Sequence, residues 1–139
     1  MNAFTSISHA VATATVADAV HVGLVRCSSD ESLKTVAALM SENRVHCVVV
    51  MDDPHDERSL RGVVSDDDLI AAATVRALDG QTAGSSATKP AVSILPTASL
   101  EDAARRMTLQ RVSHLVVVDS RHRPIGVLST LDLAQMLAV

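Results

Sequence analysis

The chain has 139 residues, which suits one compact domain or two very small domains that share a core. Hydrophobic residues make up 47% of the chain, charged residues 20%, and the formal net charge is −4, so a concentrated basic surface for nucleic acid is excluded. No apolar run approaches the length of a membrane-spanning helix, so no membrane span is expected.

Two further features of the composition restrict the kind of protein. The chain has no Trp and no Tyr, and its one aromatic residue is Phe4, so the core is predicted to be aliphatic. A site for a nucleotide base would have to work without aromatic stacking. Cys27 and Cys47 lie among apolar neighbours, which predicts buried thiols in a reducing compartment. The N-terminal stretch lacks the basic residues of a secretory signal, and we expect a cytoplasmic protein.

The first half of the chain predicts a short series of elements. An extended segment around 24–27 precedes a helix for which Ser32 is the predicted N-cap. The β-branched run 46–51 predicts a strand that is buried on both faces, because its residues are continuously apolar. A turn at 52–54 and a short strand at 62–64 follow, and a last helix begins directly after them.

The second half repeats this series, which is the main signal in the sequence. A shift of 67 residues aligns the long helix and the long strand, matching Ser32-Leu33 with Ser99-Leu100, Met40 with Met107, Arg44-Val45 with Arg111-Val112, and Val49-Val50 with Val116-Val117. The offset then falls to 64, because the loop 53–61 has nine residues and its counterpart 120–125 has six. Loops tolerate such length changes, so the two halves are predicted to share one fold.

The repeat gives the expected domain organisation. We predict an N-terminal extension at 1–14, a first repeat at 15–75, a connector at 76–81 that begins as the tail of a helix, and a second repeat at 82–139. A repeat of this size cannot bury both faces of its sheet alone, so the two repeats are expected to share a core.

The doubled pattern resembles a known family. Each repeat reads S-L-x-x-x-A-x-x-M-x-x-x-R-V and then G-V-x-S-x-x-D-L, which is similar to the two halves of a CBS-domain pair, also called a Bateman module. The opening Thr15-Val16-Ala17-Asp18 also resembles the start of the family pattern, and the resemblance covers about 15–139.

The resemblance implies a fold and a function. It implies an α+β fold of two tandem CBS repeats, with small sheets flanked by helices, packed about a pseudo-two-fold axis that leaves two clefts. Family members commonly bind adenine nucleotides or adenosyl compounds in such clefts, usually dimerise, and regulate an attached or partner protein. AMP, ADP, ATP and S-adenosylmethionine are therefore the ligands to expect, and no cofactor is expected.

The Ser-x-x-Asp element is the candidate site within each repeat. In the family an Asp at this position accepts hydrogen bonds from ribose hydroxyls, and the hydroxyl residue and helix N-terminus reach ribose or phosphate. The matching residues are Ser65 with Asp68, and Ser129 with Asp132. The same residues at the same spacing are also typical of a capping box, which only starts a helix. Both interpretations stay open from the sequence.

The two copies differ in charge. Asp66, Asp67 and Asp68 place three carboxylates together in the first copy, and these repel a phosphate. The second copy adds the hydroxyl of Thr130. It also has Arg121 and Arg123 nearby in sequence, so we predict that the second copy dominates binding of a phosphorylated ligand.

Other polar residues carry weaker predictions. Ser93 matches a hydroxyl residue on the first strand that reaches ligand in the family, and its counterpart is Arg26. His46 and His114 are expected to be half-buried, hydrogen-bonded residues beside the strands rather than ligand residues. The acidic loop after the first long strand is expected to be solvated, and no metal spacing or catalytic motif is present.

Two functions remain from the sequence. The first is a regulatory module, not an enzyme, that senses an adenine nucleotide or adenosyl compound in the inter-repeat cleft and acts on an unknown partner protein. The second is a structural module for dimerisation or protein interaction, with vestigial clefts and no ligand. Both predict a homodimer formed by the aliphatic helix faces around Leu33, Val36, Met40, Leu100, Ala103, Met107, Leu133, Met136 and Leu137.

Overall fold

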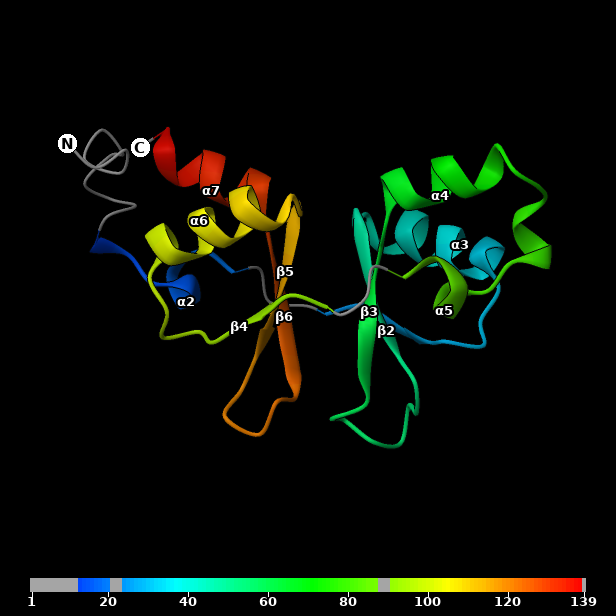
Figure 1. Cartoon of the computed structure of the whole chain (residues 1–139), viewed down its shortest axis with the longest axis horizontal. Coiled ribbons are helices and arrows are strands. Elements are labelled where there is room, and N and C mark those ends of the chain that lie inside the picture. The colour runs from blue at the N-terminus through cyan, green and yellow to red at the C-terminus, as the bar shows by residue number, and fades with distance from the viewer. Residues whose placement is uncertain (1–12, 21–23, 88–90, 139) are drawn as a thin grey trace. The chain divides into compact units, whose positions relative to one another are not determined.

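The protein consists of two compact units. The computed structural model describes residues 13–20, 24–87 and 91–138. One unit is formed by a single stretch of chain, 24–92, and is called the continuous unit below. The other combines the described residues 13–20 with 93–138 and is called the discontinuous unit. Each unit has its own small sheet with helices on one side (Figure 1).

The continuous unit contains a three-stranded sheet in the order β1-β2-β3, with β1 parallel and β3 antiparallel to the central strand. Its elements are β1 (Arg26–Ser28), α3 (Leu33–Asn43), β2 (Cys47–Met51), β3 (Leu60–Ser65), α4 (Asp66–Ala73), the 3-10 turn η2 (Leu78–Gly80) and α5 (Ala83–Ser86). Every residue of β2 is buried, as its continuous apolar run predicts.

Helix α3 begins and ends through side-chain and backbone devices that the sequence encodes. The Ser32 hydroxyl accepts a hydrogen bond from the Thr35 N–H at 3.2 Å, which confirms Ser32 as the N-cap. Arg44 ends the helix in the left-handed conformation, with φ of 53°. The apolar positions Leu33, Val36 and Met40 lie on the buried face.

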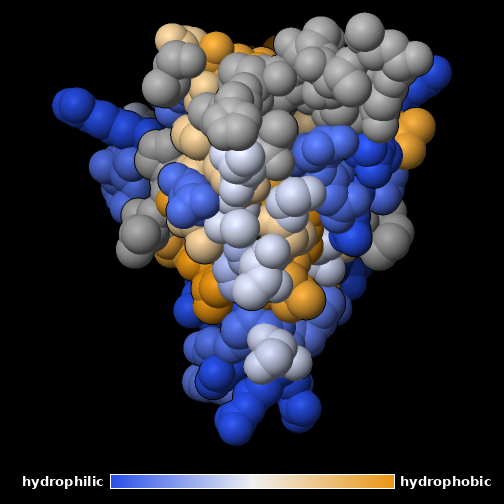
Figure 2. Space-filling view, turned by 90° about the vertical axis from the view of Figure 1, so that its left-hand side faces the viewer, coloured by the Kyte–Doolittle hydropathy of each residue, from blue (hydrophilic) through white to orange (hydrophobic). Residues whose placement is uncertain are grey.

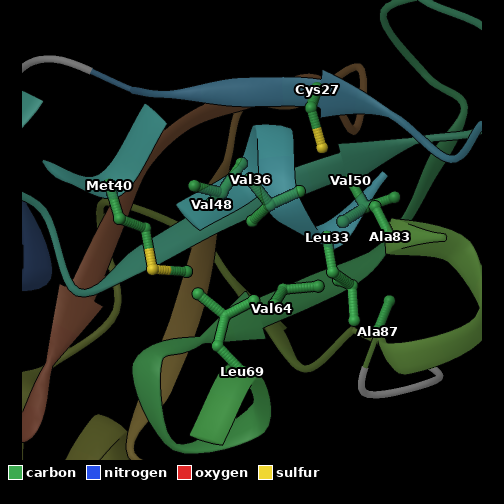
Figure 3. Packing of buried hydrophobic residues seen from close by; sticks show 10 residues of the cluster. All are labelled: Cys27, Leu33, Val36, Met40, Val48, Val50, Val64, Leu69, Ala83 and Ala87. Atoms are coloured by element: carbon green, nitrogen blue, oxygen red, sulfur yellow. The ribbon is translucent and has the colours of Figure 1, made fainter. Parts of the chain in front are cut away.

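The core of the continuous unit is aliphatic, as the composition predicts. Figure 3 shows Leu33, Val64 and Leu69 pointing toward one another between α3, β3 and α4. The cluster consists of Cys27, Leu33, Val36, Met40, Val48, Val50, Val64, Leu69, Ala83 and Ala87. Both cysteines are free and buried, which confirms that prediction.

The discontinuous unit repeats the architecture with the sheet order β4-β5-β6. Its elements are α2 (Val16–Ala19), β4 (Ser93–Ile94), α6 (Leu100–Gln110), β5 (His114–Val118), β6 (Pro124–Ser129) and α7 (Thr130–Leu137). Ser99 caps α6 by accepting from the Asp102 N–H at 3.0 Å, and Arg111 ends it with φ of 54°. The expected α+β fold of two tandem repeats with small sheets flanked by helices is confirmed.

The segment that leads into each repeat packs within the unit that holds the other repeat's strands. Thr15 forms a bridge with Ser99, and the Val16 N–H donates to the Ala98 carbonyl at 2.8 Å. The Val16 side chain is fully buried. In the continuous unit, Thr82 forms the matching bridge with Ser32. The compact units therefore do not follow the order of the repeats in the sequence.

Two expectations about the helices are wrong. Helix α4 ends at Ala73, so the connector does not begin as a helix tail. The Gln81 side chain instead closes this end by donating to the Ala72 and Arg76 carbonyls. The helix residues expected to form an exposed interface are mostly buried inside the units, because the sheets and lead-in segments cover them; the buried ones are Leu33, Val36, Met40, Leu100, Ala103, Met107 and Leu133.

Large hydrophobic side chains are nevertheless exposed elsewhere. Leu131 and Leu137 on α7 are 57% and 51% exposed, and Ile70 on α4 is 69% exposed. Figure 2 looks onto the discontinuous unit and shows hydrophobic residues at its surface above a hydrophilic lower end, where the β5–β6 loop lies in Figure 1. Among the described residues, no helix is long and apolar enough to cross a membrane.

Candidate ligand-binding turns

The first candidate site is the turn that joins β3 to α4. The Ser65 N–H donates to Asp68 Oδ2 at 2.8 Å, and the Asp68 N–H donates to Ser65 Oγ at 3.3 Å. These reciprocal hydrogen bonds form a capping box, so the two side chains start the helix. Asp68 Oδ1 accepts no hydrogen bond within the described part of the chain, so it can accept one from a ligand hydroxyl.

The second candidate site is the turn that joins β6 to α7, and it has the same geometry. The Ser129 N–H donates to Asp132 Oδ2 at 2.8 Å, and the Asp132 N–H donates to Ser129 Oγ at 3.2 Å. Asp132 is only 4% exposed, whereas Thr130 lies exposed at the first position of α7. The structure therefore brings Ser129, Thr130 and Asp132 together, as it does Ser65 with Asp68.

A third turn shows what the capping geometry does without a candidate site. Thr15 begins α2, and its N–H donates to Asp18 Oδ2 at 2.8 Å in another capping box. The Ser-x-x-Asp geometry is thus compatible with helix capping alone. Any ligand role for Asp68 or Asp132 has to come in addition to the capping role.

The strand register brings one further residue to each turn, and the sequence assigned neither of these residues to the site. Cys47 is opposite Ser65 in the β2–β3 pair, and His114 is opposite Ser129 in the β5–β6 pair. His114 is half-buried, and its Nδ1 lies 3.1 Å from Ser113 Oγ. The shift of 67 residues already pairs His114 with Cys47, so the repeat alignment contains this signal.

The charge around the first turn is strongly acidic. Asp66, Asp67 and Asp68 form the first turn of α4, and His46 Nδ1 lies 3.0 Å from Asp66 Oδ2. The prediction that His46 is half-buried is wrong, because its side chain is 73% exposed. Burial, with smaller contributions from the Asp68 and Asp66 carboxylates, raises the pKa of the neighbouring Cys47 thiol to about 12.

The basic residues expected beside the second turn lie elsewhere. Arg123 precedes β6 and Ser129 ends it, so the strand separates them by about 20 Å at roughly 3.3 Å per residue. Arg121 and Arg123 instead belong to the loop at the far end of the hairpin, where both backbone N–H groups donate to Asp119 Oδ1. The part of the preference for the second copy that rested on Arg121 and Arg123 is therefore wrong.

The two residues on the first strands of the repeats have different surroundings. Ser93 is partly buried, and its carbonyl accepts a hydrogen bond from Arg106 Nη1 at 3.1 Å. Arg26 is exposed and pairs with Glu57 of the acidic loop at 3.4 Å. The other acidic residues of this loop are exposed, as predicted. Among the residues the structure describes, no group of three or more His, Cys, Asp or Glu side chains could hold a metal ion.

The fold and the doubled turn define a tandem-repeat module of the CBS type. The CBS domain family model matches residues 16–74 and 84–139. The chain therefore belongs to the CBS domain family, and the resemblance noted from its sequence is confirmed.

Individual relatives agree with this assignment. The chain is 28% identical over 120 residues to the CBS domain-containing protein YhcV of Bacillus subtilis, covering 86% of this chain and 82% of that protein. The CBS domain protein PAE2072 of Pyrobaculum aerophilum, solved in complex with AMP, superposes with a TM-score of 0.77 at 24% identity. The match covers 91% of this chain and 100% of the PAE2072 chain. The CBS domain pair of MJ0100 was solved in complex with 5-methylthioadenosine and S-adenosyl-L-methionine. It superposes with a TM-score of 0.79 at 18% identity, and the match covers 88% of this chain and 98% of the MJ0100 chain.

One curated relative is much longer than this chain. The homoserine O-acetyltransferase of Methanosalsum zhilinae is 28% identical over 124 residues, which are 88% of this chain but 24% of that protein. The similarity therefore covers about a quarter of the length of that enzyme.

Proposed function

We propose that this chain is a regulatory CBS-domain pair that binds an adenine nucleotide or adenosyl compound and acts on a partner protein. The observation that carries the proposal is the doubled strand-to-helix turn, in which Ser and Asp take the same positions in both repeats. The AMP complex of PAE2072 and the adenosyl ligands of MJ0100 support this ligand class.

The role of the turn follows from its hydrogen-bonding capacity. A carboxylate offers about four acceptor positions, so an Asp that caps a helix can also accept hydrogen bonds from a ligand. The ribose of an adenosyl ligand presents two neighbouring hydroxyl donors, which a carboxylate can accept. The backbone N–H groups at the start of α4 or α7 favour an anionic substituent such as a phosphate.

The second turn is the better place for a phosphorylated ligand, for one reason already given from the sequence and one that the strand register adds. His114 lies opposite Ser129 and can carry a positive charge, whereas its counterpart Cys47 is a protonated thiol. The first turn carries Asp66 and Asp67 where α7 has Thr130 and Leu131. Repulsion of a phosphate is therefore weaker at the second turn.

We propose a regulatory rather than a catalytic role, in the cytoplasm. The turns supply acceptors and backbone donors but no paired nucleophile and base. The free, buried Cys27 and Cys47 suit a reducing compartment. The capping geometry also favours a second candidate, a structural dimerisation module without ligand, because the reciprocal hydrogen bonds of both Ser–Asp pairs serve to start a helix.

The deciding experiment separates binding from capping at the second turn. Asp132→Asn keeps a side-chain oxygen for the Ser129 N–H but replaces the other carboxylate oxygen with a donor. We expect calorimetric titration with AMP to show affinity weaker by about 1.5–3 kcal/mol, the range for hydrogen bonds to a charged group. Asp68→Asn is the matched variant and should weaken AMP binding less.

Capping loss needs its own control. Asp18→Ala removes the third capping box, where no ligand is expected, and should lower stability by about 0.5–2 kcal/mol without changing AMP affinity. If AMP, ADP, ATP and S-adenosylmethionine all fail to bind the wild-type chain, the result contradicts the ligand-binding proposal and favours the structural alternative. If Asp68→Asn abolishes binding and Asp132→Asn does not, the preference for the second turn is wrong.

We propose that the module is a homodimer. The support now comes from the exposed apolar side chains Leu131 and Leu137 of α7 and Ile70 of α4. Light scattering on the wild-type chain should give twice the monomer mass, and Leu131→Glu should shift it toward the monomer. A monomer mass at micromolar wild-type concentrations would contradict the proposal.

A further inference from the structure

A hollow of about 380 Å³ lies in the discontinuous unit, away from the candidate turn. It is bounded by β4, by α6 and by the loop that follows β5. Ser129 is opposite His114 at one end of the hairpin, whereas the hollow reaches Val118 and Asp119 at the other end. The hollow is therefore separate from the Ser129–Asp132 turn.

One arginine, Arg106, and the polar side chains of Ser120 and His122 line the hollow. Arg106 extends from α6. Its Nη1 donates a hydrogen bond to the Ser93 carbonyl at 3.1 Å, and its Nε lies 3.2 Å from Asp102 Oδ2, so Nη2 takes part in neither contact. Within the part of the chain that the structure describes, the Ser120 hydroxyl and the His122 ring make no hydrogen bond. Three groups able to donate hydrogen bonds thus surround one space.

The carboxylate that lines the hollow, Asp119, is ionised and paired with Arg123. Asp119 Oδ2 accepts from Arg123 Nε at 2.8 Å, and Oδ1 accepts from the Arg121 and Arg123 N–H groups, at 2.9 Å each. These contacts, led by the Arg123 backbone N–H, hold the pKa of Asp119 below its ordinary value. Asp119 therefore stays paired with Arg123, and Arg121 leaves this loop with a net positive charge.

The remaining wall of the hollow is apolar. Ile94 and Val118 are buried at its base, and Leu95 is 48% exposed beside them. A bare inorganic ion would leave this wall uncovered, whereas a ligand with a short hydrocarbon portion would cover it. The lining suits a small organic anion.

The first repeat shows that the fold does not require these polar groups. The counterpart of Arg106 under the 67-residue shift is Leu39, which packs against the core of the continuous unit. The counterpart of Ser93 is Arg26, which pairs with Glu57. Arg106 and Ser93 therefore belong to the lining of this hollow without being required by the shared architecture.

We propose that this hollow is a second ligand site that binds a small organic anion, a carboxylate or a phosphate monoester, through Arg106, Ser120 and His122. The anionic group lies between the Arg106 guanidinium and the Ser120–His122 turn, and the hydrocarbon portion lies on Ile94 and Leu95. This site goes beyond the proposed nucleotide site and does not depend on it.

The test uses butyrate and inorganic phosphate as probes on the full chain. Proton–nitrogen correlation spectra should show saturable chemical-shift changes at residues 118–122 with both probes. Butyrate should give larger changes than phosphate and should saturate the site at a lower concentration. Ser120→Glu places a negative charge in an exposed turn without disturbing the core, and should weaken binding at least tenfold. Ser120→Gln is the neutral control and should bind nearly as the wild type does.

A pair of arginine variants tests the cation directly. Arg106→Gln should abolish the shifts, whereas Arg105→Gln, one residue away on α6 and paired with Glu101 in the same i,i+4 manner, should keep them. Unchanged binding in both Arg106→Gln and Ser120→Glu would overturn the proposal, as would an absence of shifts at 118–122. Asp132→Asn must leave these shifts unchanged; if it abolishes them, the probes bind at the α7 turn and the hollow is not a site.

Discussion

Gly84 lies where the lead-in helix α5 meets the loop after β1, and adding one methyl group there should destabilise the continuous unit. A Cβ at this position would lie 3.0 Å from Ser29 Cβ, 3.1 Å from Ser29 O and 3.2 Å from Arg61 Nε. The contact cannot relax easily, because the Gly84 N–H donates to Ser29 O at 2.9 Å and Arg61 Nε donates to Gly84 O at 3.2 Å. Overpacking of this kind costs about 1–3 kcal/mol.

Gly80 provides the matched control for Gly84→Ala. A Cβ at Gly80 would meet nothing within 4 Å. Gly80→Ala should therefore raise stability by about 0.4–1 kcal/mol, because alanine restricts the unfolded chain more than glycine does. The two variants add the same group four residues apart, so their difference isolates the contact with Ser29.

Urea unfolding followed by circular dichroism measures both changes. With m of about 2 kcal/mol/M, Gly84→Ala should lower the midpoint by roughly 0.5–1.5 M, and Gly80→Ala should raise it slightly. A Gly84→Ala midpoint equal to or above that of the wild type would refute the reasoning, because the close approach of α5 to Ser29 would then not exist in solution.

Three other changes test separate parts of the fold. Val16→Ala removes two buried methyl groups and should cost at least about 1.6 kcal/mol in urea unfolding, at ~0.8 kcal/mol per group. Ser99→Ala removes the acceptor of the Asp102 N–H and should cost about 0.5–2 kcal/mol in the same assay. The Cys47 thiol has a pKa of about 12 against an ordinary 9.0, so its contribution to stability is complete below pH 9.0 and is lost as the pH rises toward 12. The free energy of unfolding should therefore fall less steeply with alkaline pH in Cys47→Ala than in the wild type.

The sequence predicted the long elements well because two copies of one pattern support each other. Ser32 and Ser99 both cap helices, and the continuous runs ending at Met51 and Val118 both form buried strands. The packing of the lead-in segments was not predictable in this way. Their four-residue helices are held by backbone hydrogen bonds to distant residues, such as Val16 N–H to Ala98 O. Backbone hydrogen bonds of this kind do not require particular side chains, so the sequence does not reveal them.

The candidate turns were predictable from spacing, but their electrostatic surroundings were not. The Ser-x-x-Asp spacing correctly predicts the reciprocal hydrogen bonds, because they are local. Closeness in sequence failed for Arg121 and Arg123, since an extended strand carries them away from Ser129. His114 was not assigned to the turn, because its place beside Ser129 depends on the register of two strands, which the sequence does not state directly.

The packing of the lead-in segments has a consequence for the order in which the chain can fold on the ribosome. The continuous unit uses only residues 24–92, so it can be completed while the rest of the chain is still being translated. The discontinuous unit needs Val16 and α7 together, although most of the chain separates them. At about 5–20 residues per second, the nascent α2 segment waits several seconds for its partner strands after it emerges. During that interval the Val16 side chain, which is buried in the folded unit, is exposed to solvent. A chaperone that binds short aliphatic segments could bind the α2 segment at this stage.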